Sequence, residues 1–380
     1  MSYTRVALVV ISMLALGCAG VGMHPGATVS VDRDALLAGP PELAAPEPVV
    51  DMLALDEEMR AYLDAHVPAD AHEQQKARFL LQAFFAEDGI RVQYDNIKTQ
   101  TAIETFHSRE GNCLAFTNLF IAMAREVGLK AYFQEVKTPA VWNSRGQLYI
   151  YNRHINVLLK YKHADDQVVD FDMANFEEEY PRKKIPDEAA IAQYHNNMSV
   201  HWLLQEDARR ALAHQRLALQ MSPQADYMWT NLGAIYSHFG YSDYAEAAFL
   251  TALSYDNTDL VAISNLARLY DRQGEAELSV YYREQAKTFR RKNPFYMYSL
   301  AEKHYADGEF IEAREELRSA IRLQKGEHKF HQLLGLTELK LGESERARKN
   351  FELAREYARE PKDRARYNRK LQLLVGTALE

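Results

Sequence analysis

Cysteine, positive charge and metal-ligand patterns are all scarce in this sequence. Only Cys18 and Cys113 occur among 380 residues, and 53 acidic side chains outnumber 45 lysines and arginines, for a formal net charge of −8. A nucleic-acid-binding protein normally presents a basic face, so this composition argues against that class. No Gly-rich phosphate loop appears, and the histidines lack the spacing of metal ligands. We therefore expect no nucleic-acid partner, no metal and no cofactor.

An N-terminal apolar segment is too short to cross a membrane. Residues 6–16 form a mainly apolar run of eleven residues, whereas a helix needs about 20 to span the hydrocarbon core. With Arg5 before it, the run is typical of an export signal over residues 1–17. The letters that end it, ALGC, resemble the lipobox of bacterial lipoproteins, whose cysteine, here Cys18, becomes the lipidated first residue. An ordinary secretory signal with an incidental cysteine is the alternative.

Lipidation at Cys18 would place the protein in the cell envelope. The residue after it is Ala19, which is compatible with transfer to the outer membrane. The resemblance thus implies an exported protein, lipid-anchored to the bacterial outer membrane and facing the periplasm. Cys113 would then be the only free thiol in an oxidising compartment, where a thiol without a purpose is a liability. Cys113 is therefore a candidate functional residue.

A proline- and alanine-rich stretch follows the predicted signal. Residues 18–50 contain five prolines among alanine, glycine and valine, and this composition predicts an extended tether. From residue 51 onward apolar side chains recur at spacings of three and four, which indicates helices packed on a core. We predict a first folded domain over residues 51–190.

The second half of the sequence repeats with a period of 34 residues. Four positions keep this step: Gly240, Gly274, Gly308 and Gly342; Leu232, Leu266, Leu300 and Leu334; Gly233, Ala267, Ala301 and Gly335; Ala252, Ala286, Ala320 and Ala354. Glycine tolerates a left-handed turn between helices, and small residues let paired helices approach closely. The pattern resembles the tetratricopeptide repeat (TPR). It implies an α-solenoid of about five repeats over residues 191–360, a capping helix over residues 361–380, and a protein or peptide partner in its groove.

The residues around Cys113 predict a thiol at the start of a helix. Gly111 and Asn112 are good turn and N-cap residues, and an apolar stripe at helical spacing follows until Gly128, which ends the helix. The backbone N–H groups and dipole of such a helix end favour a thiolate. The same N–H groups can donate to an oxyanion, and Gln93, Tyr94 and His107 are the side-chain candidates for that role.

Two alternating runs downstream predict a β-hairpin. The first is RHINVLL, which contains His154, and the second is VVDFD, which contains Asp170 and Asp172. If Ile155 and Val157 face the core, His154 and both aspartates share the other face. One strand then supplies an imidazole and its neighbour a carboxylate.

A cysteine at a helix start, a histidine on a strand and an aspartate on the next strand resemble the transglutaminase-like fold, a papain-related architecture. GNC…LFIAMAREVGLKA, RHINVLL and VVDFD look like its three motifs, over roughly residues 75–180. The resemblance implies Cys113 as nucleophile, His154 as general base and acid, and Asp170 as orienting group, with Asp172 as a rival. We expect an α+β papain/transglutaminase-like domain followed by an all-α TPR solenoid.

Two functions fit these features. The first is a membrane-anchored thiol enzyme that hydrolyses amide or peptide bonds, or transfers the acyl group, through a thioester on Cys113. Hydrolysis and transfer to an amine share this intermediate. The second is a non-catalytic TPR scaffold lipoprotein that uses an inactive transglutaminase-like fold for binding in the cell envelope.

Overall fold

The computed structural model describes most of the chain after the predicted signal. The described residues are 32–46, 48–85, 89–136, 143–145, 148–150, 154–171, 181–358 and 361–376. All of them belong to one compact unit that spans residues 31–380. None of the described helices is long and apolar enough to cross a membrane. Residues 1–17 and Cys18, on which the export and lipidation expectations depend, lie outside the described residues.

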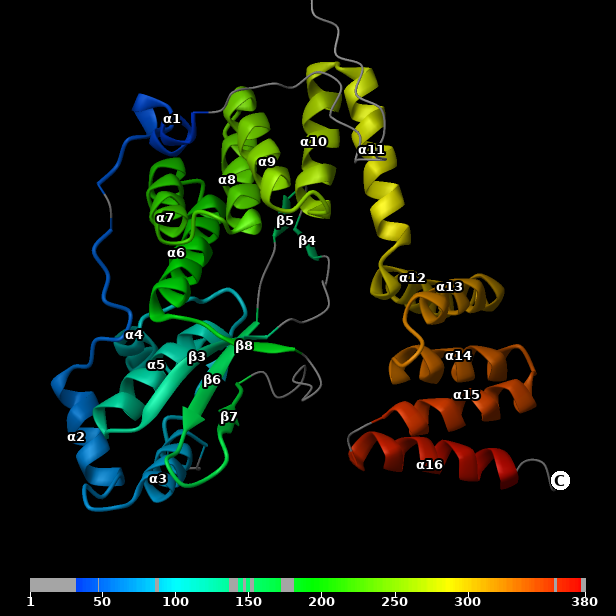
Figure 1. The fold of residues 1–380 in the computed structure, drawn as a ribbon, viewed down its shortest axis with the longest axis horizontal. Helices are drawn as coiled ribbons and strands as arrows, with labels where there is room; N and C mark the ends of the chain where they lie inside the picture. The colour runs from blue at the N-terminus through cyan, green and yellow to red at the C-terminus, as the bar shows by residue number, and fades with distance from the viewer. Residues whose placement is uncertain are drawn as a thin grey trace, which may run out of the picture. The chain divides into compact units, whose positions relative to one another are not determined.

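The first folded region contains four helices and a four-stranded antiparallel sheet (Figure 1). The helices are α2 (Glu57–His66), α3 (Glu73–Phe85), α4 (Ala102–Ser108) and α5 (Cys113–Glu126). The sheet has the order β7-β6-β3-β8, from β3 (Lys130–Val136), β6 (His154–Lys160), β7 (Gln167–Val169) and β8 (Arg182–Lys184). Two smaller pairs join β1 (Gln93–Tyr94) to β2 (Glu110–Gly111) and β4 (Asn143–Arg145) to β5 (Leu148–Ile150).

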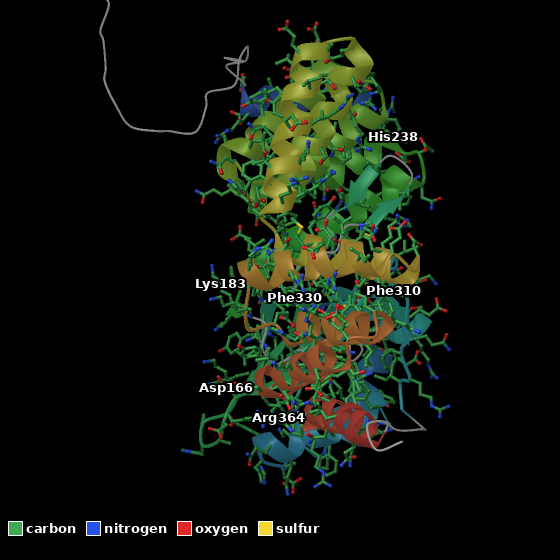
Figure 2. All side chains as sticks on the ribbon, turned by 90° about the vertical axis from the view of Figure 1, so that its right-hand side faces the viewer. Asp166, Lys183, His238, Phe310, Phe330 and Arg364 are labelled. Atoms are coloured by element: carbon green, nitrogen blue, oxygen red, sulfur yellow. The ribbon has the colours of Figure 1, made fainter. Side chains whose placement is uncertain are left out.

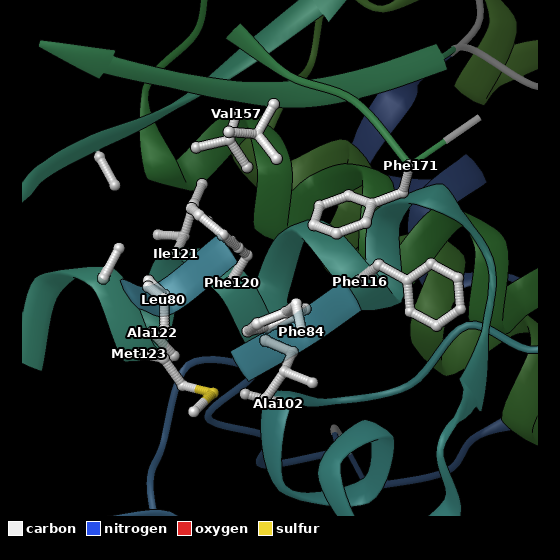
Figure 3. Close-up of a cluster of buried hydrophobic side chains, with 14 of the residues drawn as sticks. Leu80, Phe84, Ala102, Phe116, Phe120, Ile121, Ala122, Met123, Val157 and Phe171 are labelled. Carbon is white, nitrogen blue, oxygen red and sulfur yellow. The ribbon is translucent and has the colours of Figure 1, made fainter. Parts of the chain in front are cut away.

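The helix α5 lies at the centre of this region. Its residues 114–124 are all buried, so it is surrounded by protein along most of its length. Figure 3 shows Phe116 and Phe120 of α5 beside Phe84 of α3 and Val157 of β6, and all four belong to one buried cluster. Burial of this much apolar surface fixes the position of α5 against the sheet. The helix start therefore has a defined place relative to β6.

Five helix hairpins and a final helix form the second region, which confirms the predicted all-α TPR array. The hairpins are α6 (Asp187–Leu204) with α7 (Ala208–Met221), α8 (Asp226–His238) with α9 (Ser242–Tyr255), α10 (Leu260–Gln273) with α11 (Ala276–Arg291), α12 (Pro294–Ala306) with α13 (Phe310–Leu323), and α14 (His328–Lys340) with α15 (Ser344–Tyr357). The last helix is α16 (Pro361–Gly376).

The periodic residues occupy the positions that their chemistry predicts. Gly240, Gly274, Gly308 and Gly342 have φ values of 84°, 80°, 81° and 79°, in the left-handed region that glycine adopts at little cost. A Cβ atom on Gly233 would come within 2.6 Å of the Phe249 ring, so the absence of a side chain lets α8 and α9 pack. Inside the array, Phe330 of α14 (Figure 2) is fully buried and its ring contacts Phe295 and Tyr298 of α12.

A segment before the first domain packs on the repeat array. The short helix α1 (Arg33–Ala38) and the 3₁₀ turn η1 (Pro41–Leu43) bury Leu36 and Leu43 in the cluster that also contains residues of α7, α8 and α9. This segment lies within the stretch predicted as a tether, but its residues 32–46 are docked instead of extended.

Two buried histidines join the helices of the first hairpin. His195 on α6 and His214 on α7 have their Nδ1 atoms 2.9 Å apart. Burial, together with the charges of His195 and His201, lowers the pKa of His214 to about 4. Burial also lowers the pKa of His195. His195 and His214 therefore bind protons less readily in the folded array than in the unfolded chain, where a histidine takes up its proton near pH 6.5.

We expect the free energy of unfolding of the repeat array to decrease as the pH falls below 6.5. Between pH 6.5 and 4 the unfolded chain binds a proton at His214 that the folded chain does not, so stability rises with pH through this window and is complete above it. The loss at pH 5 relative to pH 8 is about 2 kcal/mol from His214. Urea denaturation followed by circular dichroism at both pH values measures it. His214→Gln should remove this loss of stability. The control His163→Gln, at an exposed position, should retain it. Equal losses in His214→Gln and wild type would show that His214 is not the source of the pH dependence.

Candidate functional site

Cys113 is the first residue of α5, as the sequence predicts. Asn112 is the N-cap, and its side-chain oxygen accepts the backbone N–H of Ala115 at 3.0 Å. The Asn112 amide also donates to Thr99 Oγ1 at 2.6 Å, which fixes the cap to the preceding loop. The thiol is partly exposed, so it is held at a helix N-terminus and remains accessible to a reactant.

Gly111 is needed for this helix start because no side chain fits there. A Cβ atom at this position would lie 2.6 Å from Ala115 Cβ, within the first turn of α5. Gly111 also pairs with Tyr94 across the parallel β1–β2 pair. This pairing places the Tyr94 hydroxyl 3.4 Å from Cys113 Sγ. Backbone register therefore sets a hydroxyl beside the thiol.

His154 and Asp170 meet through the predicted hairpin. The strands β6 and β7 are antiparallel, with Val157 opposite Val169. Asp170 follows β7 directly, and its Oδ2 atom accepts from His154 Nε2 at 2.7 Å. The same oxygen accepts from Asn156 Nδ2 at 2.8 Å. The side chains of His154 and Asp170 are 11% and 3% exposed, so this contact is largely removed from water.

The charge state of His154 depends on the two groups beside it. Burial opposes the imidazolium, but hydrogen bonds to Asp170 and to Cys113, together with the charges of both, raise the pKa of His154 to about 10. The imidazole therefore contacts both the thiol and the carboxylate. At neutral pH a charged imidazolium therefore lies beside the Cys113 side chain. The structure thus brings together Cys113, His154 and Asp170.

Phe171 fixes the position of the carboxylate. Its ring packs against Phe84, Phe116 and Phe120, with centroid distances of 6.0, 5.7 and 5.9 Å (Figure 3). Phe116 and Phe120 lie on the helix that begins with Cys113. Aromatic contacts of this kind carry a large buried area. The residue next to Asp170 is therefore attached to the helix that presents the thiol.

The three oxyanion candidates are separated by the structure. Tyr94 lies at the thiol. His107 instead contacts Asp56, with 2.6 Å between Nε2 and Oδ2. Gln93 is exposed on β1, and its backbone N–H donates to the carbonyl of Arg109. Asp172, the rival of Asp170, lies outside the described residues.

Asn156 and Phe171 are site residues that the sequence reasoning did not single out. Asn156 is two residues after His154 on one strand and therefore points to the same side as His154. This two-residue spacing is the feature of the sequence from which a second donor to the carboxylate could have been predicted. Alternation with the two aspartates predicts that Phe171 faces the core, as it does, but its contacts with α3 and α5 depend on packing between distant segments.

Comparison with known families agrees with this geometry. Residues 62–154 match the model of the transglutaminase-like superfamily. The matched range begins in α2 and ends at His154, so it includes both the thiol and the imidazole. The chain carries a transglutaminase-like domain. Asp170 lies beyond the matched range, and its place beside His154 comes from the structure of this domain.

Several solved structures are similar to about half of the chain. The crystal structure of MamA is 19% identical, with a TM-score of 0.25, and the match covers 44% of this chain and 91% of that one. The Pseudomonas aeruginosa pilF structure is 15% identical, with a TM-score of 0.27, over 50% of this chain and 94% of that one. YrrB, described as a TPR protein with an unusual peptide-binding site, is 16% identical, with a TM-score of 0.25, over 47% and 92%. Among curated proteins, none matches the chain.

We expect Asp170→Asn to lower the pKa of His154 by more than one unit from its value of about 10. The amide keeps the size of the carboxylate but removes the charge that favours the imidazolium. Histidine side-chain NMR over pH 5–11 measures the titration. Asp166→Asn is the matched control, because Asp166 pairs with Lys160 at 3.5 Å on the exposed side of the same hairpin (Figure 2). An unchanged His154 titration in Asp170→Asn would refute this account of the site.

Proposed function

We propose that the transglutaminase-like domain is a thiol enzyme that forms an acyl-thioester on Cys113. The observation that carries this proposal is the chain of contacts from Cys113 through His154 to Asp170, in which the imidazole pKa is raised to about 10. A protonated imidazole beside a partly exposed thiol at a helix N-terminus is the arrangement that thiol acyl transfer needs.

The reaction begins with attack of the Cys113 thiolate on the carbonyl carbon of an amide. The oxygen of the tetrahedral intermediate is stabilised by backbone N–H groups at the start of α5 and by the hydroxyl of Tyr94. His154 gives its proton to the leaving nitrogen, the C–N bond breaks, and the amine departs. The acyl group remains on sulfur as a thioester.

The second half of the reaction regenerates the thiolate. Water or a primary amine attacks the thioester and loses a proton to the neutral His154, and the C–S bond then breaks. Asp170 holds the ring with Nε2 toward the carboxylate, so that the other nitrogen faces sulfur. Hydrolysis and amine transfer differ only in the acceptor.

We also propose a location and a binding partner for the protein. Lipidation of Cys18 would anchor the chain to the outer membrane, so that the enzyme acts on peptides or proteins of the periplasm. The TPR array would hold such a partner along its groove, since stacked hairpins of this kind present an extended binding surface. These assignments rest on the N-terminal motif and on the array of helices.

We expect Cys113→Ala to abolish acyl-enzyme formation. The full chain is incubated with peptides released from a bacterial envelope fraction, and the mass of the Cys113 peptide is measured before and after treatment with hydroxylamine, which cleaves thioesters. Wild type should show a hydroxylamine-sensitive adduct on Cys113. His154→Ala should reduce its rate of formation by about 10³-fold or more. The matched control is His163→Ala, at an exposed histidine of the β6–β7 turn, which should behave as wild type. Turnover that persists in Cys113→Ala would eliminate the enzyme proposal.

The membrane anchor has an independent test. Cells grown with an alkyne-tagged fatty acid should label the wild-type protein and leave Cys18→Ser unlabelled, with the variant released from the membrane fraction. Cys113→Ser serves as control and should keep the label, because it retains the cysteine of the lipobox. Labelling of Cys18→Ser at the wild-type level would show that the anchor lies elsewhere.

A further inference from the structure

The segment of residues 33–43 is bound on the repeat array in the manner of a peptide ligand. It lies against α7, the end of α8 and the start of α9, and it buries Leu36 and Leu43 to 3% and 8% exposure. Most of the other side chains of α1 and η1 remain exposed to solvent. A six-residue helix is too short to be stable by itself, so its shape depends on this contact.

The array recognises this segment mainly through its backbone. The Tyr236 hydroxyl donates to the carbonyl of Leu36 at 2.6 Å. Arg216 donates to the carbonyls of Leu37 and Ala38, at 2.9 and 3.0 Å. Arg209 donates to the carbonyl of Glu42 at 3.0 Å. Side chains that bind main-chain carbonyls, with a few apolar pockets between them, form the type of surface that receives an extended or irregular peptide.

Gly39 makes the recognition selective. Its φ of 67° and ψ of −176° lie in a region that is essentially restricted to glycine. A Cβ atom there would lie 2.7 Å from Tyr236 Oη and 2.8 Å from Leu212 Cδ2. The backbone of the segment therefore approaches the array so closely at this point that any side chain would collide with it. Burial of Pro40 next to it continues the contact.

We propose that the surface formed by Arg209, Leu212 and Arg216 of α7, Tyr236 of α8, and Tyr241, whose hydroxyl donates to Glu42 Oε1 at 3.2 Å, is a peptide-binding site. Residues 33–43 of the chain are its detachable resident ligand. The ligand class is a peptide with leucine, glycine-proline and leucine at the spacing of Leu36, Gly39, Pro40 and Leu43. The site lies on α7 of the first hairpin and on the end of α8 and the turn to α9 in the second. It is independent of the thiol chemistry proposed above, and neither proposal depends on the other.

The experiment cleaves the chain after the segment and measures whether a free peptide of the same sequence can replace it on the array. A specific protease site replaces residues 48–50, where Val49 is fully exposed, in the full-length protein. After cleavage, a fluorescein-labelled synthetic peptide of residues 32–46 is added and its anisotropy is followed. We expect saturable binding to the cleaved protein, with at least tenfold weaker binding to the uncleaved protein, because the attached segment competes at a millimolar effective concentration.

Matched variants make the result specific. The Gly39→Ala peptide should bind at least tenfold more weakly than the parent, whereas the Ala38→Ser peptide, changed at an exposed neighbouring position, should bind as the parent does. In the cleaved protein, Arg216→Ala should weaken binding and Arg210→Ala should not, since Arg210 of the same helix contacts Asp207 instead. Failure of the labelled peptide to bind the cleaved protein, or equal binding of the Gly39→Ala peptide, would overturn the proposal and make the segment an integral part of the array.

Discussion

The buried carboxylate of Asp170 receives hydrogen bonds from both His154 and Asn156 on one oxygen, and the geometry of the site depends on this arrangement. A carboxylate that is 3% exposed is costly to leave unpaired, so the strand β6 must keep both donors in register with it. The interaction therefore fixes the ring of His154 as well as its charge. Without it, burial would oppose the imidazolium and only the contact with Cys113 would still favour it.

Packing transmits this constraint to the thiol. Phe171 follows Asp170 in sequence and contacts Phe116 and Phe120 of the helix that starts at Cys113, so that packing links the carboxylate to the helix that presents the sulfur. Gly111 and Asn112 then set the first turn of that helix against the preceding loop. If Cys113 and His154 act as the proposed nucleophile and base, a shift of about 1 Å between them would cost a large factor in rate. The aromatic cluster therefore contributes to the site although none of its rings takes part in the chemistry.

Features that depend on neighbouring residues could be predicted from the sequence, whereas features that depend on packing between distant segments could not. The 34-residue period predicted the helix hairpins because each glycine turn is a local backbone requirement, and φ near 80° at Gly274 and Gly308 agrees with this. The order of Cys113, His154 and Asp170 predicted a hairpin beside a helix start. The contact of Phe171 with α3 could not be read from the sequence, because it joins segments far apart in the chain. Docking of residues 33–43 was hidden for a related reason: only two of its leucines are buried, and its composition is that of a tether.

If Cys18 is lipidated, as proposed, the docked segment shortens the free stretch of chain between that anchor and the first docked residue. If residues 18–50 were free, 33 residues would separate the anchor from residue 51, a span of at most about 110 Å. With residues 33–43 bound to α7, α8 and α9, only 14 residues separate Cys18 from residue 32, a span of at most about 50 Å. If a competing peptide displaced this segment, as proposed, the undocked stretch after Cys18 would lengthen from 14 to 33 residues.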